Sequence, residues 1–301
     1  MQGSNYILLA LLFGHSYLSA NKGASFSQLL SSGAWYAAAM SSSGQYQLLP
    51  LSNGNLYKSS DYGATWTAVT TIGTSNWRGV AMSGNGQFQY CCAFDSAVYK
   101  SSDYGANWQY VAPLSLSNLM SIACSDDGNY VTVVQYGGGL RYSSNGGTSS
   151  IGVAPTGTSR NWLRVAMSAS GQHQVVCAEY IFATQLYTHV YVSSNYGATW
   201  TPVSLVSLSW RSVAVSASGQ YMYAASTSKV FRSTDYGANW TEVYDSSNYG
   251  FMDIACTSDG SLVYVLKNIE GLLLSADHGQ NYTEIDTPSG NMRQLAISEI
   301  L

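Results

Sequence analysis

Apolar residues along the chain come in runs of about four to eight, each bounded by Gly, Asn, Asp or Ser. Two examples are Trp77-Arg-Gly-Val-Ala-Met-Ser83 and Tyr130-Val-Thr-Val-Val134. Runs of this length that are rich in aromatic and β-branched residues are typical of short buried strands. No segment keeps an apolar period of about 3.6 residues over several turns. The pattern therefore predicts an all-β protein with almost no helix.

One eight-residue segment, Ser59-Ser-Asp-Tyr-Gly-Ala-Thr-Trp66, recurs along the chain, and we call it the octet. Octets occupy residues 19–26, 59–66, 101–108, 143–150, 193–200, 233–240 and 275–282. Their third positions are 40, 42, 42, 50, 40 and 42 residues apart. A repeat of about this length is characteristic of β-propeller blades rather than of helical arrays.

Each repeat can be divided into four strands. The first strand is small and apolar, a Gly turn leads into a second and more apolar strand, and the octet connects a brief third strand to a fourth. We expect a single-domain, seven-bladed β-propeller of four-stranded antiparallel blades with one octet per blade. The expected blades are residues 32–73, 74–115, 116–158, 159–207, 208–247, 248–289, and a closing blade of 290–301 plus 1–31.

The closing blade is expected to combine the two ends of the sequence. The chain starts with second, third and fourth strands and ends with a first strand, so residues 292–298 should pair with residues 6–13 and leave no open edge. The apolar stretch 6–13 looks like the core of a signal peptide. However, residues 6–20 align with the strands of the next repeat, and we interpret them as blade strands rather than as a leader.

The octet resembles the Asp-box, or BNR repeat, of sialidases, sortilin-type receptors, photosystem assembly factors and xyloglucan-cleaving glycosidases. An Asp or Asn in the third position can accept backbone N–H bonds within the turn, the Gly supplies a left-handed position, and the terminal Trp is expected to fill space between blades. We therefore give the octets a structural role. It involves Asn21, Asp61, Asp103, Asn145, Asn195, Asp235 and Asp277 at the third position, and Trp66, Trp108, Trp200 and Trp240 at the last.

Composition narrows the possible partners. Charged residues make up 9% of the chain, the net charge is −4, and there are 12 Lys and Arg residues. With so few cations we expect neither nucleic-acid binding nor membrane insertion. We expect no metal or cofactor either, because neither the histidines nor the cysteines follow ligand spacings. Low charge favours an extracellular location, whereas the five cysteines, interpreted as buried thiols, suit a reducing one. The cysteines are Cys91, Cys92, Cys124, Cys177 and Cys256.

The resemblance implies that ligands bind on the face opposite the octets. One repeat is longer than the others there, and its insertion carries Glu179, Tyr180, Phe182, Gln185, Tyr187 and His189. In addition, Arg78, Arg211 and Arg293 occupy one position of three first strands, and Arg164 lies one place later in a fourth. These arginines form either a carboxylate site or a structural ring near the channel mouth. Both sets are candidate ligand-binding residues.

Three functions remain open from the sequence. The first is a non-catalytic, lectin-like propeller that binds neutral glycans, because the candidate loops offer amides, hydroxyls and aromatic rings. The second is a scaffold for protein interaction or assembly, and the third is a glycoside hydrolase. Catalysis is disfavoured because the chain lacks the Arg-Ile-Pro segment of sialidases. The acids expected near the binding face, Glu179, Asp253 and Glu270, also show no spacing that pairs them.

Overall fold

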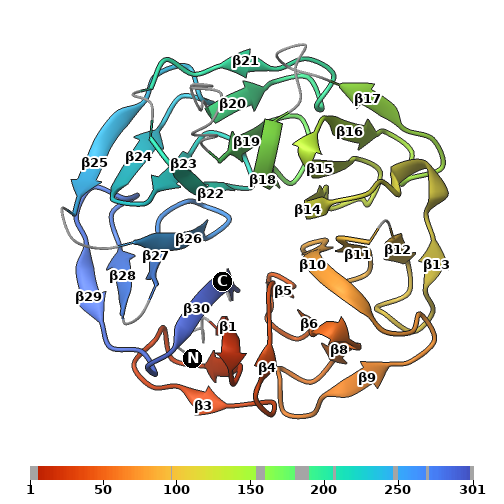
Figure 1. The fold of residues 1–301 in the computed structure, drawn as a ribbon. Helices are drawn as coiled ribbons and strands as arrows, with labels where there is room; N and C mark the ends of the chain where they lie inside the picture. The colour runs from red at the N-terminus through yellow and green to blue at the C-terminus, as the bar shows by residue number, and fades with distance from the viewer. Residues whose placement is uncertain are drawn as a thin grey trace.

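Antiparallel sheets arranged radially around a common axis form the molecule, as Figure 1 shows. This computed structural model describes residues 6–95, 97–153, 160–179, 190–205, 208–246, 250–268 and 271–298. The only helical element among them is a 3-10 turn, η1 (Ala112–Leu114). The predicted all-β class and the propeller architecture are therefore confirmed.

The strands pair mainly with their neighbours in the sequence, from the inner strand outwards. Three sheets have the simple orders β5-β6-β8-β9, β22-β23-β24-β25 and β26-β27-β28-β29. Their strands are β5 (Ala39–Met40), β6 (Gln47–Pro50), β8 (Leu56–Ser59), β9 (Thr67–Val69), β22 (Trp210–Val215), β23 (Met222–Ser226), β24 (Lys229–Ser233), β25 (Thr241–Asp245), β26 (Phe251–Cys256), β27 (Val263–Lys267), β28 (Leu272–Ser275) and β29 (Thr283–Ile285).

Two further sheets have extra pairings. One has the order β13-β12-β11-β10-β7, and in the other β15 pairs with β18 and so joins the strands β14 to β17 to the strands β18 to β21. Their strands are β7 (Ser52–Gly54), β10 (Ser75–Met82), β11 (Gln89–Ala93), β12 (Ala97–Ser101), β13 (Gln109–Tyr110), β14 (Leu119–Cys124), β15 (Val131–Gly138), β16 (Leu140–Ser143), β17 (Ile151–Val153), β18 (Arg160–Met167), β19 (Gln174–Ala178), β20 (Val190–Ser193) and β21 (Thr201–Pro202).

The last sheet joins the two ends of the chain, as the sequence predicts. Its order is β3-β2-β1-β30, with β4 also paired to β1, and the strands are β1 (Ile7–Gly14), β2 (Tyr17–Ser19), β3 (Ser27–Gln28), β4 (Gly33–Ala34) and β30 (Asn291–Ile297). The antiparallel register runs from Ile7 opposite Ile297 to Leu12 opposite Asn291. The expected closure is confirmed, and the apolar stretch near the start of the sequence is strand β1.

One predicted first strand is shorter than expected. Residues 35–41 resemble the run at residues 77–83 and were expected to form one continuous strand, but the ladder contains only β5 and an isolated bridge between Trp35 and Leu51. In the register of the other repeats, Pro50 lies opposite the gap. Proline has no N–H to donate, so it interrupts the ladder there.

The largest fully buried side chains belong to the first strands. Trp77, Trp162 and Trp210 are completely inaccessible, and Trp35 is nearly so. The octet tryptophans were expected to fill space between blades. Trp200 is buried, and the half-buried Trp66, Trp108 and Trp240 pack against core clusters that contain residues of two successive repeats, as expected. Each octet indole also donates its Nε1–H to the Gly carbonyl of its own turn, at 3.0–3.2 Å.

Every octet folds into the same hydrogen-bonded turn. In residues 59–66, Ser59 Oγ donates to Asp61 Oδ1 (2.8 Å), Gly63 N–H donates to Ser59 Oγ (2.9 Å), and Thr65 N–H donates to Asp61 Oδ1 (2.9 Å). The same three bonds recur in the other octets, with Asn21, Asp103, Asn145, Asn195, Asp235 and Asp277 in the third position. The third residue therefore fixes the turn.

An acid-stability difference follows from this geometry. Hydrogen bonds from Thr65 lower the pKa of Asp61. The ionised Asp61 therefore contributes fully to folding stability above the unfolded pKa of about 3.9, and this contribution is lost as pH falls through the folded pKa. Octet 193–200 differs from 59–66 only in having Asn195 for Asp61. Thermal melts from pH 7 to pH 2 should therefore show Asp61→Asn within about 2 °C of wild type at pH 7 and less sensitive to acid below about pH 4.

The reciprocal variant is the matched control for that comparison. Asn195→Asp should lose more stability than wild type over the same acid range, because it adds a carboxylate in the same turn. Acid curves that stay parallel for wild type, Asp61→Asn and Asn195→Asp would contradict the assignment.

Aromatic rings also connect successive repeats on the octet side. The fourth octet residue, which has a positive φ in Tyr196 and Tyr236, stacks on the start of the second strand of the preceding repeat. Tyr196 lies 4.3 Å from Tyr130 and Tyr236 lies 4.8 Å from His173, measured between ring centroids. The hairpin position at Gly219 requires glycine for two reasons. Gly219 has a positive φ, and a Cβ there would lie only 2.6 Å from the His173 side chain.

Candidate functional site

A bulge near the start of six first strands directs one side chain of each into the channel. In β10 the pairing passes from Trp77 opposite Ala93 to Gly79 opposite Cys92, so Arg78 is skipped. The same shift skips one residue in β14, β18, β22, β26 and β30, and the skipped residues are Met120, Leu163, Arg211, Met252 and Arg293. Bulges redirect side chains in this way and are frequent beside binding sites.

All the skipped side chains line one cavity. Its volume is about 110 Å³, and Tyr36 and Arg164 complete the lining. Arg164 follows the skipped Leu163 and is itself paired in the ladder, opposite Cys177, yet its side chain also lines this cavity. Four arginines therefore meet at one end of the channel, and we call this site the arginine mouth. The sequence placed them at similar strand positions, but bulges that aim them together cannot be read from residue spacing.

Only one of the four guanidinium groups forms an ion pair within the described ranges. Arg211 Nη1 lies 3.2 Å from Glu179 Oε1, and Tyr136 donates its hydroxyl to Glu179 Oε2 at 3.4 Å. Arg78 stacks on an aromatic ring, with its guanidinium carbon 3.8 Å from the Tyr36 centroid. Cation–π contact leaves the N–H groups of Arg78 available to an acceptor.

The other guanidinium groups at the mouth are short of hydrogen-bond acceptors. The Nε atoms of Arg78, Arg164 and Arg293 are buried and, in the part of the chain that the structure describes, have no hydrogen-bond partner. Burial lowers the pKa of Arg293, Tyr36 opposes this shift, and Arg164, Arg211 and Arg78 lower the pKa further. The mouth thus concentrates positive charge in a partly desolvated place, which is the arrangement that attracts an anion.

Below the mouth lies a second cavity of about 230 Å³. Asp253 of β26 is buried in its wall, where it accepts hydrogen bonds from Ser212 Oγ of β22 and from the Leu295 N–H of β30 (2.9 Å for the latter). Burial raises the pKa of Asp253, and Arg164 opposes the shift. The sequence placed Asp253 near the binding face, but it instead links three inner strands within the channel.

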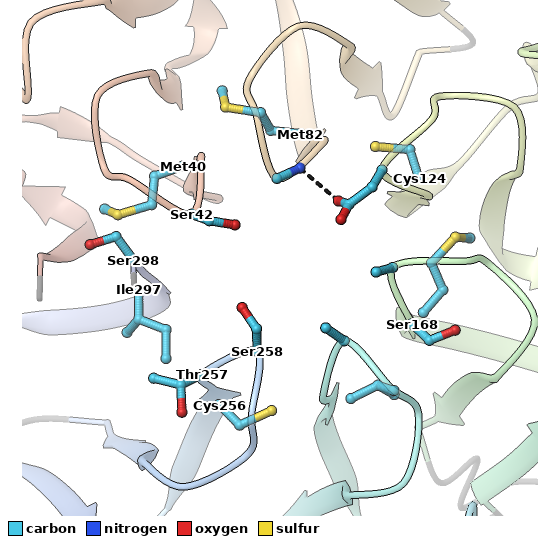
Figure 2. Close-up of a pocket in the computed structure, with 16 residues that line it drawn as sticks. Met40, Ser42, Met82, Cys124, Ser168, Cys256, Thr257, Ser258, Ile297 and Ser298 are labelled. Carbon is cyan, nitrogen blue, oxygen red and sulfur yellow. Dashed lines mark hydrogen bonds between the residues drawn. The ribbon is translucent and has the colours of Figure 1, made fainter. Parts of the chain in front are cut away.

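The far end of the channel is a third cavity, of about 190 Å³, shown in Figure 2. Backbone hydrogen bonds between successive repeats run along its rim. Ser42 N–H donates to Gly84 O, Asp126 N–H to Ala169 O, and Ala217 N–H to Ser258 O, each at 2.8 Å. The Asp126 carboxylate accepts the N–H of Gly84 at 2.7 Å, which is the dashed line in Figure 2. These hydrogen bonds join neighbouring repeats at this end of the channel.

Cysteine positions agree only in part with the expected burial. Cys91, Cys92 and Cys177 are buried, whereas Cys124 and Cys256 are half-buried and line the far cavity. Burial raises the pKa of Cys124, and it raises that of Cys92 to about 12. Neutral thiols are poor nucleophiles and poor metal ligands. Within the described ranges no group of three or more His, Cys, Asp or Glu side chains is placed to hold a metal ion.

Several candidate residues from the sequence lie outside the described residues. They are Tyr180, Phe182, Gln185, Tyr187 and His189 of the insertion, together with Glu270. The structure adds Tyr36 and Tyr136, which the sequence did not single out because aromatic residues are abundant throughout the chain. Among the described residues, no helix has the length and hydropathy needed to cross a membrane.

Comparisons with known proteins agree with the architecture. The model of a family described as the DUF6242 beta propeller domain matches residues 156–299. A search of curated protein sequences finds no match. The fold and this match define the class of the protein as a β-propeller.

Solved structures show the same fold at low sequence identity. YCF48 bound to D1 peptide has a TM-score of 0.62 and 15% identity, over 83% of this chain and 80% of that chain. YCF48 from Cyanidioschyzon merolae has a TM-score of 0.59 and 14% identity, over 83% and 84%. The GH74 xyloglucanase from Xanthomonas campestris has a TM-score of 0.73 and 15% identity, over 98% of this chain and 52% of the enzyme, so the chain spans about half of that protein. Identities this low establish the fold alone.

Proposed function

We propose that the protein is a non-catalytic, seven-bladed Asp-box propeller that binds an acidic segment of a protein partner at the arginine mouth. The observation that carries the proposal is that Arg78, Arg164 and Arg293 meet at one cavity, while the described residues place no carboxylate within 4.0 Å of them. Guanidinium groups bind carboxylates in a bidentate manner, so a side-chain or terminal carboxylate of a peptide is the ligand that such a site selects.

The comparison with YCF48 supports a peptide ligand, because a propeller of the same fold is known bound to D1 peptide. Other hypotheses from the sequence gain less support. Neutral glycan binding by the loops opposite the octets remains a prediction, but the mouth brings four arginines together, which favours an anionic ligand. For a glycosidase, Glu179 is ion-paired and Asp253 is committed to inner strands, so neither is a free catalytic acid.

Fluorescence polarisation with a labelled peptide tests the proposal. The probe is a Gly/Ser peptide ending in Asp-Glu with a free carboxyl terminus, and its counterpart is an amidated peptide ending in Asn-Gln. We expect the protein to prefer the acidic peptide, and we expect a rise in ionic strength from about 20 to 200 mM to weaken binding. The double variant Arg78→Gln/Arg293→Gln should lose affinity at least about tenfold, or about 1.4 kcal/mol.

Two further variants sharpen the test. Glu179→Gln should increase affinity several-fold, because it removes the carboxylate that competes for Arg211. Lys22→Asn removes an exposed cation in an octet and should change nothing. Equal affinity for the two peptides, or full affinity in the double variant, would refute the proposal. Binding of sialyllactose without binding of the acidic peptide would refute it too, in favour of an acidic sugar.

A further inference from the structure

Two surface grooves lie at equivalent places in the repeat and share no lining residue with the arginine mouth. Groove 1 is formed by β13 and the octet turn at residues 146–148, and its volume is about 380 Å³. Groove 2 is formed by β21 and the octet at residues 235–240, and its volume is about 580 Å³. Each therefore lies between the fourth strand of one repeat and the octet of the next. Both volumes fall in the range of small-molecule sites.

The charged groups of the grooves are already bonded within the protein. In groove 1, Lys100 Nζ donates to the Gly146 carbonyl at 3.3 Å, and the Asp103 carboxylate accepts from the backbone N–H (2.8 Å) and the side-chain amide (2.7 Å) of Asn107. In groove 2, Asp235 accepts the equivalent pair from Asn239. Because these charges are satisfied, the groups left for a ligand are neutral. They are the exposed side-chain amide of Gln109 in groove 1 and the exposed hydroxyls of Thr201 and Ser204 in groove 2.

Each groove also has an exposed tyrosine whose ring packs against another aromatic ring of the protein. Tyr110 in groove 1 is 56% exposed and packs edge-on against Tyr99, with centroids 5.6 Å apart. Tyr236 in groove 2 is 48% exposed and rests on His173. A fixed aromatic face beside neutral donors and acceptors matches a sugar, which has apolar C–H faces and a rim of hydroxyl groups.

We infer that grooves 1 and 2 are binding sites for neutral saccharides. This inference does not depend on the arginine mouth, because the two sites share no residue and select ligands of different charge. It also differs from the glycan site expected from the sequence, since the grooves are formed by the octets rather than by the loops opposite them. Two shallow sites on one ring bind weakly one at a time, and a ligand that carries several copies of the sugar gains affinity through avidity.

Amide chemical shifts of the ¹⁵N-labelled full chain test the inference, with cellobiose, lactose and maltose each titrated to about 20 mM, a range suited to weak single sites. At least one sugar should shift the Thr148 amide in groove 1 and the Trp240 indole N–H in groove 2. Tyr110→Ser should raise the Kd at groove 1 at least tenfold and leave groove 2 unchanged. Tyr236→Asn should do the reverse, and asparagine suits the positive φ of that position.

The control is Tyr62→Asn, which removes an octet tyrosine of similar exposure that lines neither groove. It should leave both Kd values unchanged, as should Arg78→Gln/Arg293→Gln. The inference is overturned if none of the three sugars shifts either groove, or if Tyr110→Ser and Tyr236→Asn leave the shifts intact. Sugar binding that is lost in the arginine variant would also overturn it, because the sugar would then occupy the mouth.

Discussion

Deletion of residues 291–301 should abolish cooperative folding. The deletion removes β30, which pairs with β1 from Ile7 to Leu12 and buries Met292 and Leu295 against the neighbouring sheets. It also removes Ser298, whose Oγ accepts the Tyr6 N–H at 2.8 Å. Without β30, strand β1 would present a long apolar edge, which is a template for aggregation.

Circular dichroism melting and size-exclusion chromatography would measure this effect. The deleted protein should show no cooperative transition, or should elute as aggregate. Deletion of residues 299–301 alone is the control, because it keeps the whole β1–β30 ladder, and it should melt like the full chain. An unchanged melting temperature after removal of 291–301 would show that the ring does not depend on this pairing.

The second large effect is expected at Trp77. Its side chain is completely buried in β10 and donates its indole N–H to the Gly54 carbonyl at 2.9 Å. Trp77→Ala should cost about 3–5 kcal/mol of unfolding free energy, because it leaves a cavity in the core. Trp77→Phe keeps most of the ring and should cost less. Urea unfolding followed by fluorescence of the remaining tryptophans would measure both.

Trp108 provides the comparison that makes this prediction specific. It belongs to an octet, is half-buried, and contacts the Gly105 carbonyl of its own turn at 3.2 Å. Trp108→Ala should therefore cost only about 1–2 kcal/mol, because the truncated ring is partly exposed. Losses of equal size for Trp77→Ala and Trp108→Ala would show that octet tryptophans contribute to the core as much as first-strand tryptophans do.

Much of the architecture could be predicted from the sequence because repeated residues report local geometry. In each octet, hydrogen bonds within one turn connect the Ser, the Asp or Asn, and the Gly. The residues that define the motif are therefore the same residues that form the turn. The pairing of β1 with β30 follows from which strands are missing at each end of the sequence. The break at Pro50 was also visible in principle, because a proline in a central strand removes a ladder donor.

The candidate site was less predictable because it depends on contacts between repeats. Residue spacing placed Arg78, Arg211 and Arg293 at equivalent positions, but the bulges that turn them into one cavity arise from strand pairing. The ion pair between Glu179 and Arg211 joins residues 32 positions apart, so the local sequence does not predict it. Asp253 was expected near the binding face, and its role in the channel wall could not be predicted either, because its partners Ser212 and Leu295 lie on neighbouring strands.

Pairing of β1 with β30 also sets the order of events during synthesis. The ribosome makes β1, at residues 7–14, long before it makes the partner of β1 on the inner side, at residues 291–297. At about 5–20 residues per second, the ribosome takes tens of seconds to make the intervening chain. Throughout that interval β1 has an unpaired edge. It carries Leu8, Leu9 and Ala10, which are fully buried in the folded ring. The nascent chain therefore has its greatest need of chaperone protection before the last strand emerges.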